Sequence, residues 1–284
     1  MRSFDHEISS AANPRVKSWA KLLERKTRDR EGKFLLEGVH LVKEALEAGW
    51  PLEIVAFEQG TNVLEEIGEA SPSNGPGGLS EPTWIPVSSE VIAKCSDTGT
   101  PQPIFAVARK RPPSAEAFFA AERSLVVVLD GVQDPGNVGT IVRSAAASGA
   151  TAVVLGKGTA DLYSPKTVRS TMGALFHVPV LEANLLELLP EAAARGVAIV
   201  GTSLQAARSC YEYDFANGSA WLVLGNEGSG ISPEAAAFAH ANVIIPMSGR
   251  AESLNVAMAA TVLLFEAQRQ RLVSPSNNSC PTRF

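Results

Sequence analysis

The stretch SLVVVLDGVQDPGNVGTIVRSAAASGATAVVLG, residues 124–156, decides the fold. It holds two continuous apolar runs, 124–130 and 150–156, on either side of an alanine-rich segment. Such uninterrupted runs are typical of strands that are buried on both faces of a parallel sheet. The segment between them predicts a helix, so the stretch forms a strand–helix–strand unit of an α/β fold.

The same alternation continues to residue 271. Further apolar runs lie at 196–203, 220–225 and 241–246. Predicted helices lie at 138–149, 185–196, 232–240 and 253–271. We therefore predict an α/β domain with a parallel sheet, in which ligands bind beyond the carboxyl ends of the strands.

The residues before this domain have a different pattern of predicted helices and strands. A basic helix is predicted at 14–30, a second helix stops near Gly49, and strands are predicted at 52–58 and 103–111. A Pro/Gly/Ser-rich stretch at 71–82 predicts an exposed loop. Pro112 and Pro113 then interrupt the chain. The predicted domains are 1–112 and 124–272, joined by a linker at 113–123 and followed by a flexible tail at 273–284.

The composition excludes several classes of protein. The 284 residues are 45% hydrophobic and 19% charged, which disfavours a long disordered chain. No apolar run is long enough to span a membrane, and the N-terminus lacks the apolar core of a secretory signal. The three cysteines form no CxxC and the four histidines no HxxxH, so neither a disulfide scaffold nor a metal site is predicted. We expect a cytoplasmic protein, with an organelle left open.

Positive charge is concentrated at the N-terminus although the whole chain carries −5. Residues 1–33 hold nine Lys/Arg against five Asp/Glu. Local basic patches bind phosphates even on acidic proteins, because screening confines the interaction to about 8–10 Å. The predicted RNA-binding residues are Lys17, Lys21, Arg25, Lys26 and Arg109. The alternative is that this segment is an ordinary solvated helix face.

Three polar loops follow predicted strands of the α/β domain. The first, 130–145, lacks both GxGxxG and the P-loop pattern, and Asn137 is placed to cap its helix. Arg143 lies farther along that helix, either on the surface or aimed into a site. The second loop, LVLGNEGSGIS at 222–232, is rich in glycine and could wrap a small ligand, or be a plain connection with Ser232 as cap. The third, 245–271, presents Ser253 either as a cap or as part of a ligand loop.

Together these loops resemble the SpoU family of RNA ribose methyltransferases, in the SPOUT superfamily. The matching stretches are NVGTIVRSA, LVLGNEGSGIS and IPMSGRAESLNVAMAATVLLFEA, and SPKTVRSTMGALFHVPV (164–180) is similar to the segment between the first two motifs. The resemblance covers about residues 123–271. FLLEGVHLVKEALEAG is similar to the family's small substrate-binding domain, which resembles L7Ae/L30e folds.

The resemblance implies a fold, a cofactor and an assembly. The α/β sheet would end in a deep C-terminal trefoil knot, S-adenosylmethionine would bind in the knot, and the protein would be a homodimer with its site near the subunit boundary. The cofactor-binding positions carried over are Thr202, Ser203, Gly225, Asn226, Ile245 and Leu254. The implied reaction is methyl transfer to a ribose 2′-hydroxyl, with ribosomal RNA favoured over transfer RNA.

The resemblance also assigns catalytic roles. The catalytic positions that it implies are Arg143, Asn137, Glu227, Ser253 and Asn255. Arg143 would activate the 2′-hydroxyl, either as a base or, more easily for a protonated guanidinium, as an electrostatic stabiliser. Asn137 and Asn255 would position Arg143 and the ribose, and Glu227 would orient Arg143 by a charge-assisted hydrogen bond. His177 is expected to be a packing residue.

Other functions compete with this one. A transfer RNA 2′-O-methyltransferase and a non-catalytic RNA-binding protein of the same fold are the alternatives. A nicotinamide-dependent oxidoreductase is disfavoured because GxGxxG is missing.

Overall fold

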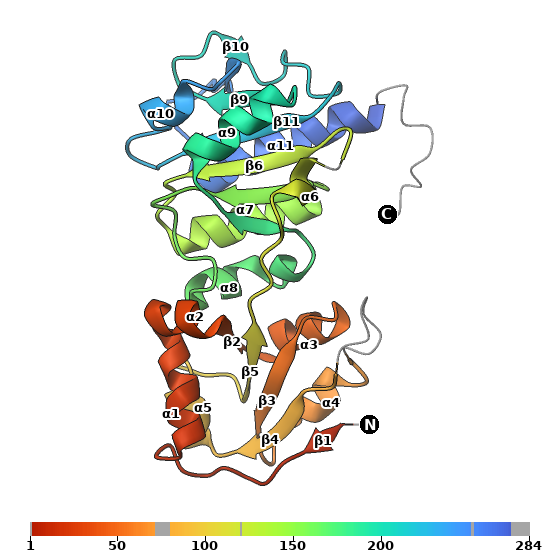
Figure 1. The fold of residues 1–284 in the computed structure, drawn as a ribbon, viewed down its shortest axis with the longest axis vertical. Helices are drawn as coiled ribbons and strands as arrows, with labels where there is room; N and C mark the ends of the chain where they lie inside the picture. Colours follow the sequence, from red (N-terminus) through yellow and green to blue (C-terminus); the bar gives the residue numbers. More distant parts are fainter. Residues whose placement is uncertain (1, 72–79, 120, 251–252, 274–284) are drawn as a thin grey trace. The chain divides into compact units, whose positions relative to one another are not determined.

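The computed structural model describes residues 2–71, 80–119, 121–250 and 253–273 (Figure 1). The chain folds into two compact units. The first contains Met1–Arg111 and Asp161–His177, and the second contains Pro112–Ala160 and Val178–Phe284. The predicted tail from residue 274 onward and most of the predicted 71–82 loop lie outside the described residues.

The first unit is built on a mixed sheet with the strand order β1-β4-β3-β5-β2. Its described strands are β1 (Ser3–Phe4), β2 (Lys33–Glu37), β3 (Leu52–Glu58), β4 (Thr83–Val87) and β5 (Ile104–Arg109). Its helices are α1 (Pro14–Ala20), the 3-10 turn η1 (Lys21–Leu23), α2 (Arg25–Glu31), α3 (Val39–Glu47), α4 (Val63–Ile67), α5 (Ser89–Lys94), α8 (Pro165–Thr171) and the 3-10 turn η3 (Ala174–Phe176). Trp19 and Leu22 pack with Leu35 and Phe105 in its core.

The predicted basic helix at 14–30 is interrupted. Glu24 has extended backbone angles, which separate α1 and η1 from α2. The guanidinium of Arg28 donates to the carbonyls of Leu22 and Leu23, which the break leaves without helical partners. The strand β2 was not predicted from the sequence, because a short apolar run before a helix has no periodicity of its own.

The second unit has a parallel sheet, as predicted. In its described part the strand order is β10-β12-β9-β11-β6-β7-β8, and every strand pairing is parallel. The strands are β6 (Leu125–Asp130), β7 (Ala152–Leu155), β8 (Val180–Glu182), β9 (Ala198–Thr202), β10 (Arg208–Ser209), β11 (Ala220–Gly225) and β12 (Ala241–Ile244). The helices are α6 (Glu116–Phe119), α7 (Pro135–Ala147), α9 (Leu185–Ala194), α10 (Pro233–Ala236) and α11 (Val256–Val273).

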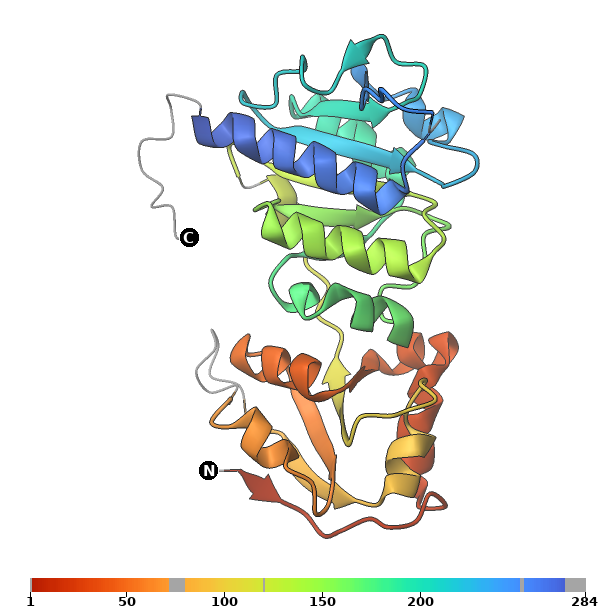
Figure 2. The same cartoon turned by 180° about the vertical axis from the view of Figure 1, so that it is seen from behind.

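Helices cover both faces of this sheet. Figure 1 shows α9 in front of the strands, and Figure 2, from behind, shows α7 and α11 side by side on the other face. The α9 face buries Leu188 and Leu189 against Val126 and Trp221. On the other face, the hydroxyls of Ser144 (α7) and Thr261 (α11) lie 2.7 Å apart. Among the described helices, none is long and apolar enough to cross a membrane.

Two segments pack differently from the sequence prediction. The predicted linker contains α6, whose Phe118 is 1% exposed in the core of the second unit and whose Phe119 stacks on Trp221. Residues 161–177, predicted as part of 124–272, fold with the first unit instead. There Tyr163 lies against Phe34. Burial of such aromatic rings against residues more than a hundred positions away cannot be seen in local spacing.

His177 does not have the expected packing role. Its side chain is 52% exposed, and Nε2 lies 3.0 Å from a carboxylate oxygen of Glu44. The residue therefore makes a polar contact at the surface of the first unit.

Candidate functional site

The motif loops gather at one edge of the parallel sheet. β6 and β11 are neighbours, and Gly225 at the end of β11 is in register with Asp130 at the end of β6. The loops that leave these two strands therefore start at the same level. They open toward the chain that leads into α11, and this edge is where parallel α/β sheets bind ligands.

The loop after β11 is held tightly against the loop after β6. A Cβ atom on Gly225 would lie 2.0 Å from the carbonyl carbon of Gly230, so only glycine fits there. The Asn226 amide donates to the carbonyl of Gly131 at 2.8 Å, and its Oδ1 accepts from the backbone N–H of Gly228 at 2.9 Å. The carboxylate of Asp130 accepts from the N–H of Ser232 at 2.7 Å. The side chain of Asn226, predicted as a cofactor contact, is thus used to fasten the loop.

The sequence predicted Asn137 as the N-cap of α7, but the structure does not place it there. The cap is Asp134, whose side chain accepts from the backbone N–H of Asn137 at 3.0 Å. An acidic residue directly before Pro135 was the signal for this cap, because proline favours the first helical position. The Asn137 side chain is left free to make contacts outside the helix.

Asn137 joins two other predicted residues in a three-residue network. Its Nδ2 donates to Oε1 of Glu227 at 2.9 Å, and its Oδ1 accepts from Nδ2 of Asn255 at 3.0 Å. Asn255 in turn caps α11, because its Oδ1 accepts from the backbone N–H of Ala257 at 2.9 Å. Ser253 therefore does not cap this helix. The network of Asn137, Glu227 and Asn255 ties all three motif loops together.

Glu227 is further held by the loop after β6. Its carboxylate accepts from the backbone N–H of Gln133 at 3.2 Å and of Asp134 at 3.4 Å. Partial burial pushes the pKa of Glu227 up, but the hydrogen bonds from Asn137 and from backbone N–H groups outweigh it and lower the pKa below its ordinary value. The side chain is a carboxylate at neutral pH. The sequence did not identify Gln133 and Asp134 as its partners.

Arg143 lies apart from this network. Its side chain is exposed and makes no hydrogen bond or ion pair with any described residue. Six residues beyond Asn137 on α7, it is displaced by about 9 Å along the helix axis and faces a different direction. The hydrogen bonds of Glu227 go to Asn137 and to backbone groups, so the predicted orientation of Arg143 by Glu227 is not what the structure has.

The predicted cofactor positions lie at the ends of three adjacent strands. Thr202 ends β9, Gly225 ends β11 and Ile245 follows β12, and these strands are neighbours in the sheet. The Thr202 hydroxyl donates to the carbonyl of Val223 at 3.1 Å, and the Ser203 N–H donates to the carbonyl of Val243 at 3.1 Å. Leu254 is 42% exposed beside Asn255. Backbone groups with an exposed apolar side chain suit a nucleoside cofactor that is held by the main chain.

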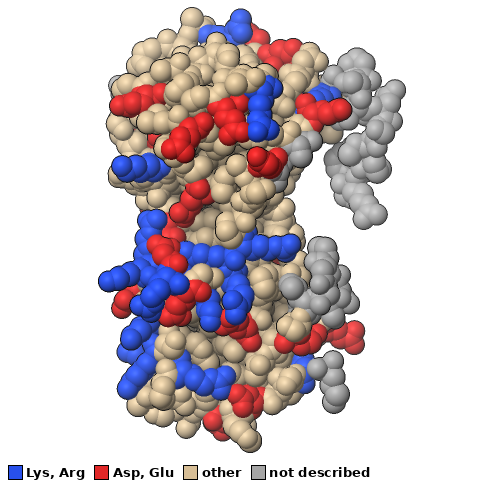
Figure 3. Space-filling view, in the orientation of Figure 1, with Lys and Arg blue, Asp and Glu red and all other residues tan. Residues whose placement is uncertain are grey.

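The predicted RNA-binding residues differ in whether their side chains form ion pairs with described residues. Lys17, Lys21 and Lys26 are exposed and form no ion pair within the described residues, whereas Arg25 lies 3.5 Å from Asp29 and Arg109 pairs with Glu53. Figure 3 shows Lys and Arg side chains gathered over the α1–α2 side of the first unit. The basic surface therefore exists, and the three lysines are unpaired charges on it.

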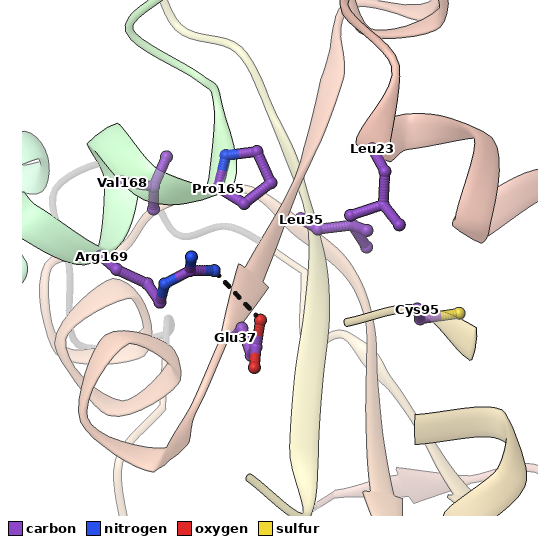
Figure 4. A pocket seen from close by; sticks show the side chains of 7 residues that line it. All are labelled: Leu23, Leu35, Glu37, Cys95, Pro165, Val168 and Arg169. Carbon is purple, nitrogen blue, oxygen red and sulfur yellow. Dashed lines mark hydrogen bonds and ion pairs between the residues drawn. The ribbon is translucent and has the colours of Figure 1, made fainter. Parts of the chain in front are cut away.

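A small recess in the first unit has no chemistry of its own. It is lined by residues that include Leu35, Glu37, Cys95 and Arg169, and it has space for about one water molecule (Figure 4). Glu37 and Arg169 pair at 3.3 Å across it. Burial raises the pKa of Cys95 to about 12, so the thiol is unreactive at neutral pH. The described residues contain no group of His, Cys, Asp or Glu that could hold a metal ion.

Two family models match the chain. Residues 124–265 match the SpoU rRNA methylase family, and residues 13–106 match the MRM3-like substrate binding domain. The two matched ranges place the motif loops in the first family and the basic segment in the second.

Relatives and solved structures match along almost the whole chain. The 23S rRNA (guanosine(2553)-2′-O)-methyltransferase RlmP of Bacillus subtilis is 38% identical over 91% of this chain and 98% of its own. The 23S rRNA (uridine(2479)-2′-O)-methyltransferase of Streptomyces viridochromogenes is 32% identical over 93% and 92%. The structure of an AdoMet-bound rRNA methyltransferase from Sinorhizobium meliloti superposes with a TM-score of 0.82 at 34% identity, covering 95% of this chain and 99% of that one.

Proposed function

The chain belongs to the SpoU rRNA methylase family, and we propose that it transfers a methyl group from S-adenosylmethionine to a ribose 2′-hydroxyl of ribosomal RNA. The observation that carries the proposal is the network of Asn137, Glu227 and Asn255, which ties the three motif loops into one site. Relatives named as 23S rRNA 2′-O-methyltransferases favour ribosomal over transfer RNA. A cytoplasmic location goes with this substrate.

The chain's own residues have two tasks in this reaction. S-adenosylmethionine, when bound, supplies a methyl group that the 2′-oxygen attacks in line. The hydroxyl is a poor nucleophile, so the site must align it and must accept its proton or stabilise the oxygen as charge develops. Alignment alone supplies roughly 7–11 kcal/mol of a barrier. The network fixes the side chains of Asn137 and Asn255, because each amide has its donor and acceptor assigned by Glu227 or by the cap of α11.

Arg143 is the residue that we assign to the 2′-hydroxyl. Its guanidinium is exposed and is not neutralised by a described carboxylate, so its full positive charge is available to a developing oxyanion. A guanidinium stays protonated at neutral pH, which makes electrostatic stabilisation easier than proton abstraction. Ser253, exposed just before Asn255, is proposed as a further contact to the substrate.

The cofactor is proposed to bind at the ends of β9, β11 and β12. Thr202, Ser203, Gly225, Ile245 and Leu254 would hold it, mainly through backbone groups. Asn226 contributes through its backbone, since its side chain is bonded within the loop. Calorimetry of the full chain with S-adenosylhomocysteine tests this site. Absence of binding to the folded protein would contradict it.

We further infer a C-terminal trefoil knot and an L7Ae/L30e-like first domain. β12 lies beyond β9 in the sheet, yet the chain returns from it so that α11 packs on α7 and β11. This return path supports the knot. The match of residues 13–106 to a substrate-binding domain supports an RNA-binding role for the first domain.

A homodimer is proposed from one face of α11. Met258, Phe265 and Leu272 are exposed and recur every seventh residue, so they form one apolar stripe along the helix. A second copy of the chain would cover this stripe. Sedimentation should show a dimer for the wild type and a monomer for Phe265→Glu, and a monomeric wild type would contradict the assignment.

The substrate is tested by mapping 2′-O-methyl groups in RNA from cells with and without the protein. One ribosomal RNA site should lose its methyl group, and purified protein should restore it with S-adenosylmethionine. Loss of a transfer RNA methyl group would support the transfer RNA alternative. RNA binding without any transfer would support the non-catalytic alternative.

A further inference from the structure

One arginine of the basic segment points inward rather than toward solvent. Arg28 is 3% exposed, and its guanidinium pairs with the carboxylate of Asp161 at 2.5 Å. Among the ion pairs of the described residues, this is the most buried. The other guanidinium contacts are the carbonyls of Leu22 and Leu23, at 2.8 and 2.7 Å. Arg28 therefore cannot contribute to a surface that binds phosphates.

Asp161 begins the segment 161–177, which folds with the first unit. Its second carboxylate oxygen accepts from the N–H of Tyr163 at 2.9 Å, and its backbone carbonyl accepts from the hydroxyl of Thr167 at 2.8 Å. These bonds shape the turn that leads into α8. The Arg28–Asp161 pair thus fixes the place where the segment starts.

The residues just before Asp161 support the loop after β6. The N–H of Ala160 donates to the carbonyl of Val132 at 2.9 Å. The Thr159 hydroxyl donates to the carbonyl of Leu129 at 3.0 Å and accepts from the N–H of Gly131 at 3.2 Å. The next residue after Val132 is Gln133, whose N–H donates to Glu227. One peptide bond, from Ala160 to Asp161, therefore joins the buried pair to the loop that holds Glu227.

We propose that Arg28 and Asp161 are positioning residues for methyl transfer: their pair fixes residue 161, and thereby the 156–160 loop and the Gln133–Glu227 contact. This inference rests on the proposed function. Breaking a buried pair leaves a charge without its partner, and the neighbouring backbone moves to solvate it. That movement reaches Ala160 directly, since it is the adjacent residue in the chain.

The effect of removing the charge of Asp161 distinguishes a positioning role of Arg28 from direct contact with RNA. If Arg28 bound phosphate, removing the negative charge of Asp161 would strengthen RNA binding and steepen its salt dependence. If the pair positions the loop, Asp161→Asn lowers kcat and leaves the salt slope unchanged.

The experiment uses the full chain and measures kcat and KM for ribosomal RNA, the salt dependence of RNA binding and hydrogen exchange of peptides that cover 129–134. Asp161→Asn should lower kcat by about 2- to 30-fold, the range of coupling through a packed network. Exchange at 129–134 should become faster, while S-adenosylhomocysteine affinity changes less than kcat. Asp5→Asn is the matched control: it removes one negative charge from an exposed ion pair with Arg15 in the same unit. It should behave as wild type.

Arg28→Lys is the second variant, since it keeps the charge but cannot reach Asp161 and both carbonyls together. It should show the same loss of kcat and the same faster exchange. Unchanged kcat with unchanged exchange at 129–134 would overturn the proposal, and so would unfolding of the first unit by both variants. If wild-type protein transfers no methyl group to ribosomal RNA, the proposed function fails. In that case hydrogen exchange at 129–134 alone tests the positioning role: faster exchange in both variants supports it, and unchanged exchange contradicts it.

Discussion

Glu227 shows how a single side chain can organise a site. Its two carboxylate oxygens accept three hydrogen bonds, one from the Asn137 amide and two from backbone N–H groups of the loop after β6. A carboxylate can satisfy all of these donors, whereas a neutral amide has one acceptor oxygen and two donors of its own. The ionised form is thus the one that the loop is built to hold.

Glu227→Gln should lower kcat by about tenfold or more, because hydrogen bonds to a charged group contribute about 1.5–3 kcal/mol. The pKa of Glu227 is lowered in the folded protein. Its contribution to stability is therefore complete above its ordinary pKa of 4.5 and is lost as the pH falls through the lower, folded-state value. Wild type and variant should differ in unfolding free energy by a constant amount from pH 6 to 8, and the difference should shrink in acid. A difference that grew in acid would contradict this assignment.

Arg143→Ala should lower kcat by about 100-fold or more, as expected for the loss of electrostatic catalysis. S-adenosylhomocysteine affinity should stay near the wild-type value, because the side chain of Arg143 has no hydrogen bond or ion pair with any of the proposed cofactor positions among the described residues. Single-turnover methyl transfer measures the first quantity and calorimetry the second. Arg195→Ala serves as control: this exposed arginine directly follows α9, which covers the opposite face of the sheet. Wild-type turnover in Arg143→Ala would remove the residue from the site.

At the scale of elements, the loop between β11 and α10 depends on close backbone approach. Residues 226 and 230 form a two-way backbone bridge, with N···O distances of 2.9 and 3.0 Å, directly over Gly225. The loop is closed upon itself and fastened to β6 by Asp130. It can therefore present Glu227 in one place.

Gly225→Ala should destabilise the second unit by about 1–3 kcal/mol, the usual cost of overpacking, because the new Cβ would overlap backbone atoms that cannot turn away. Scanning calorimetry, which can resolve the transitions of separate units, measures the change. The matched control is Gly228→Ala in the same loop, where a Cβ would meet its nearest atom at an ordinary 3.5 Å. Equal melting temperatures of the two variants would show that the close backbone approach at Gly225 is not required.

At the scale of the whole molecule, charge separates into a basic surface and an acidic remainder. Part of the basic surface is internally neutralised: Lys110 pairs with Asp29 at 2.6 Å, and Lys33 with Glu53 at 2.7 Å. The unpaired lysines on α1, η1 and α2 are among the charges that remain available to an RNA backbone.

Replacing Lys17, Lys21 and Lys26 together by alanine should weaken RNA binding and reduce the slope of log K against log salt by about 2, if each lysine contacts one phosphate of single-stranded RNA. Cofactor affinity should not change. Arg109→Ala should have a smaller effect, because Glu53 already holds that guanidinium. Filter binding over a series of salt concentrations measures the slope. An unchanged slope in the triple variant would favour the solvated-helix interpretation.

The sequence alone determined the class of fold, and the resemblance of its motif loops to a known family picked out the residues of the three-residue network. Buried parallel strands are continuous apolar runs, and the motif residues stand at fixed offsets from them, so both are local patterns. The strands at 52–58 and 220–225 were predicted with the bounds that the structure has. The resemblance of the motif loops rested on the same short stretches.

Only the tertiary structure decided which residues form hydrogen bonds and ion pairs with one another. The partners of Glu227 lie about ninety residues earlier in the chain, and Arg28 meets Asp161 across 133 positions. It also decided that residues 161–177 fold with the first unit and that Phe118 is buried in the second. Contacts of this kind depend on which surfaces meet when the sheets form, and a single sequence carries no local period for them. For the same reason, the break at Glu24 divided one predicted basic helix into α1 with η1 and a separate α2, with Arg28 facing inward and the lysines facing solvent.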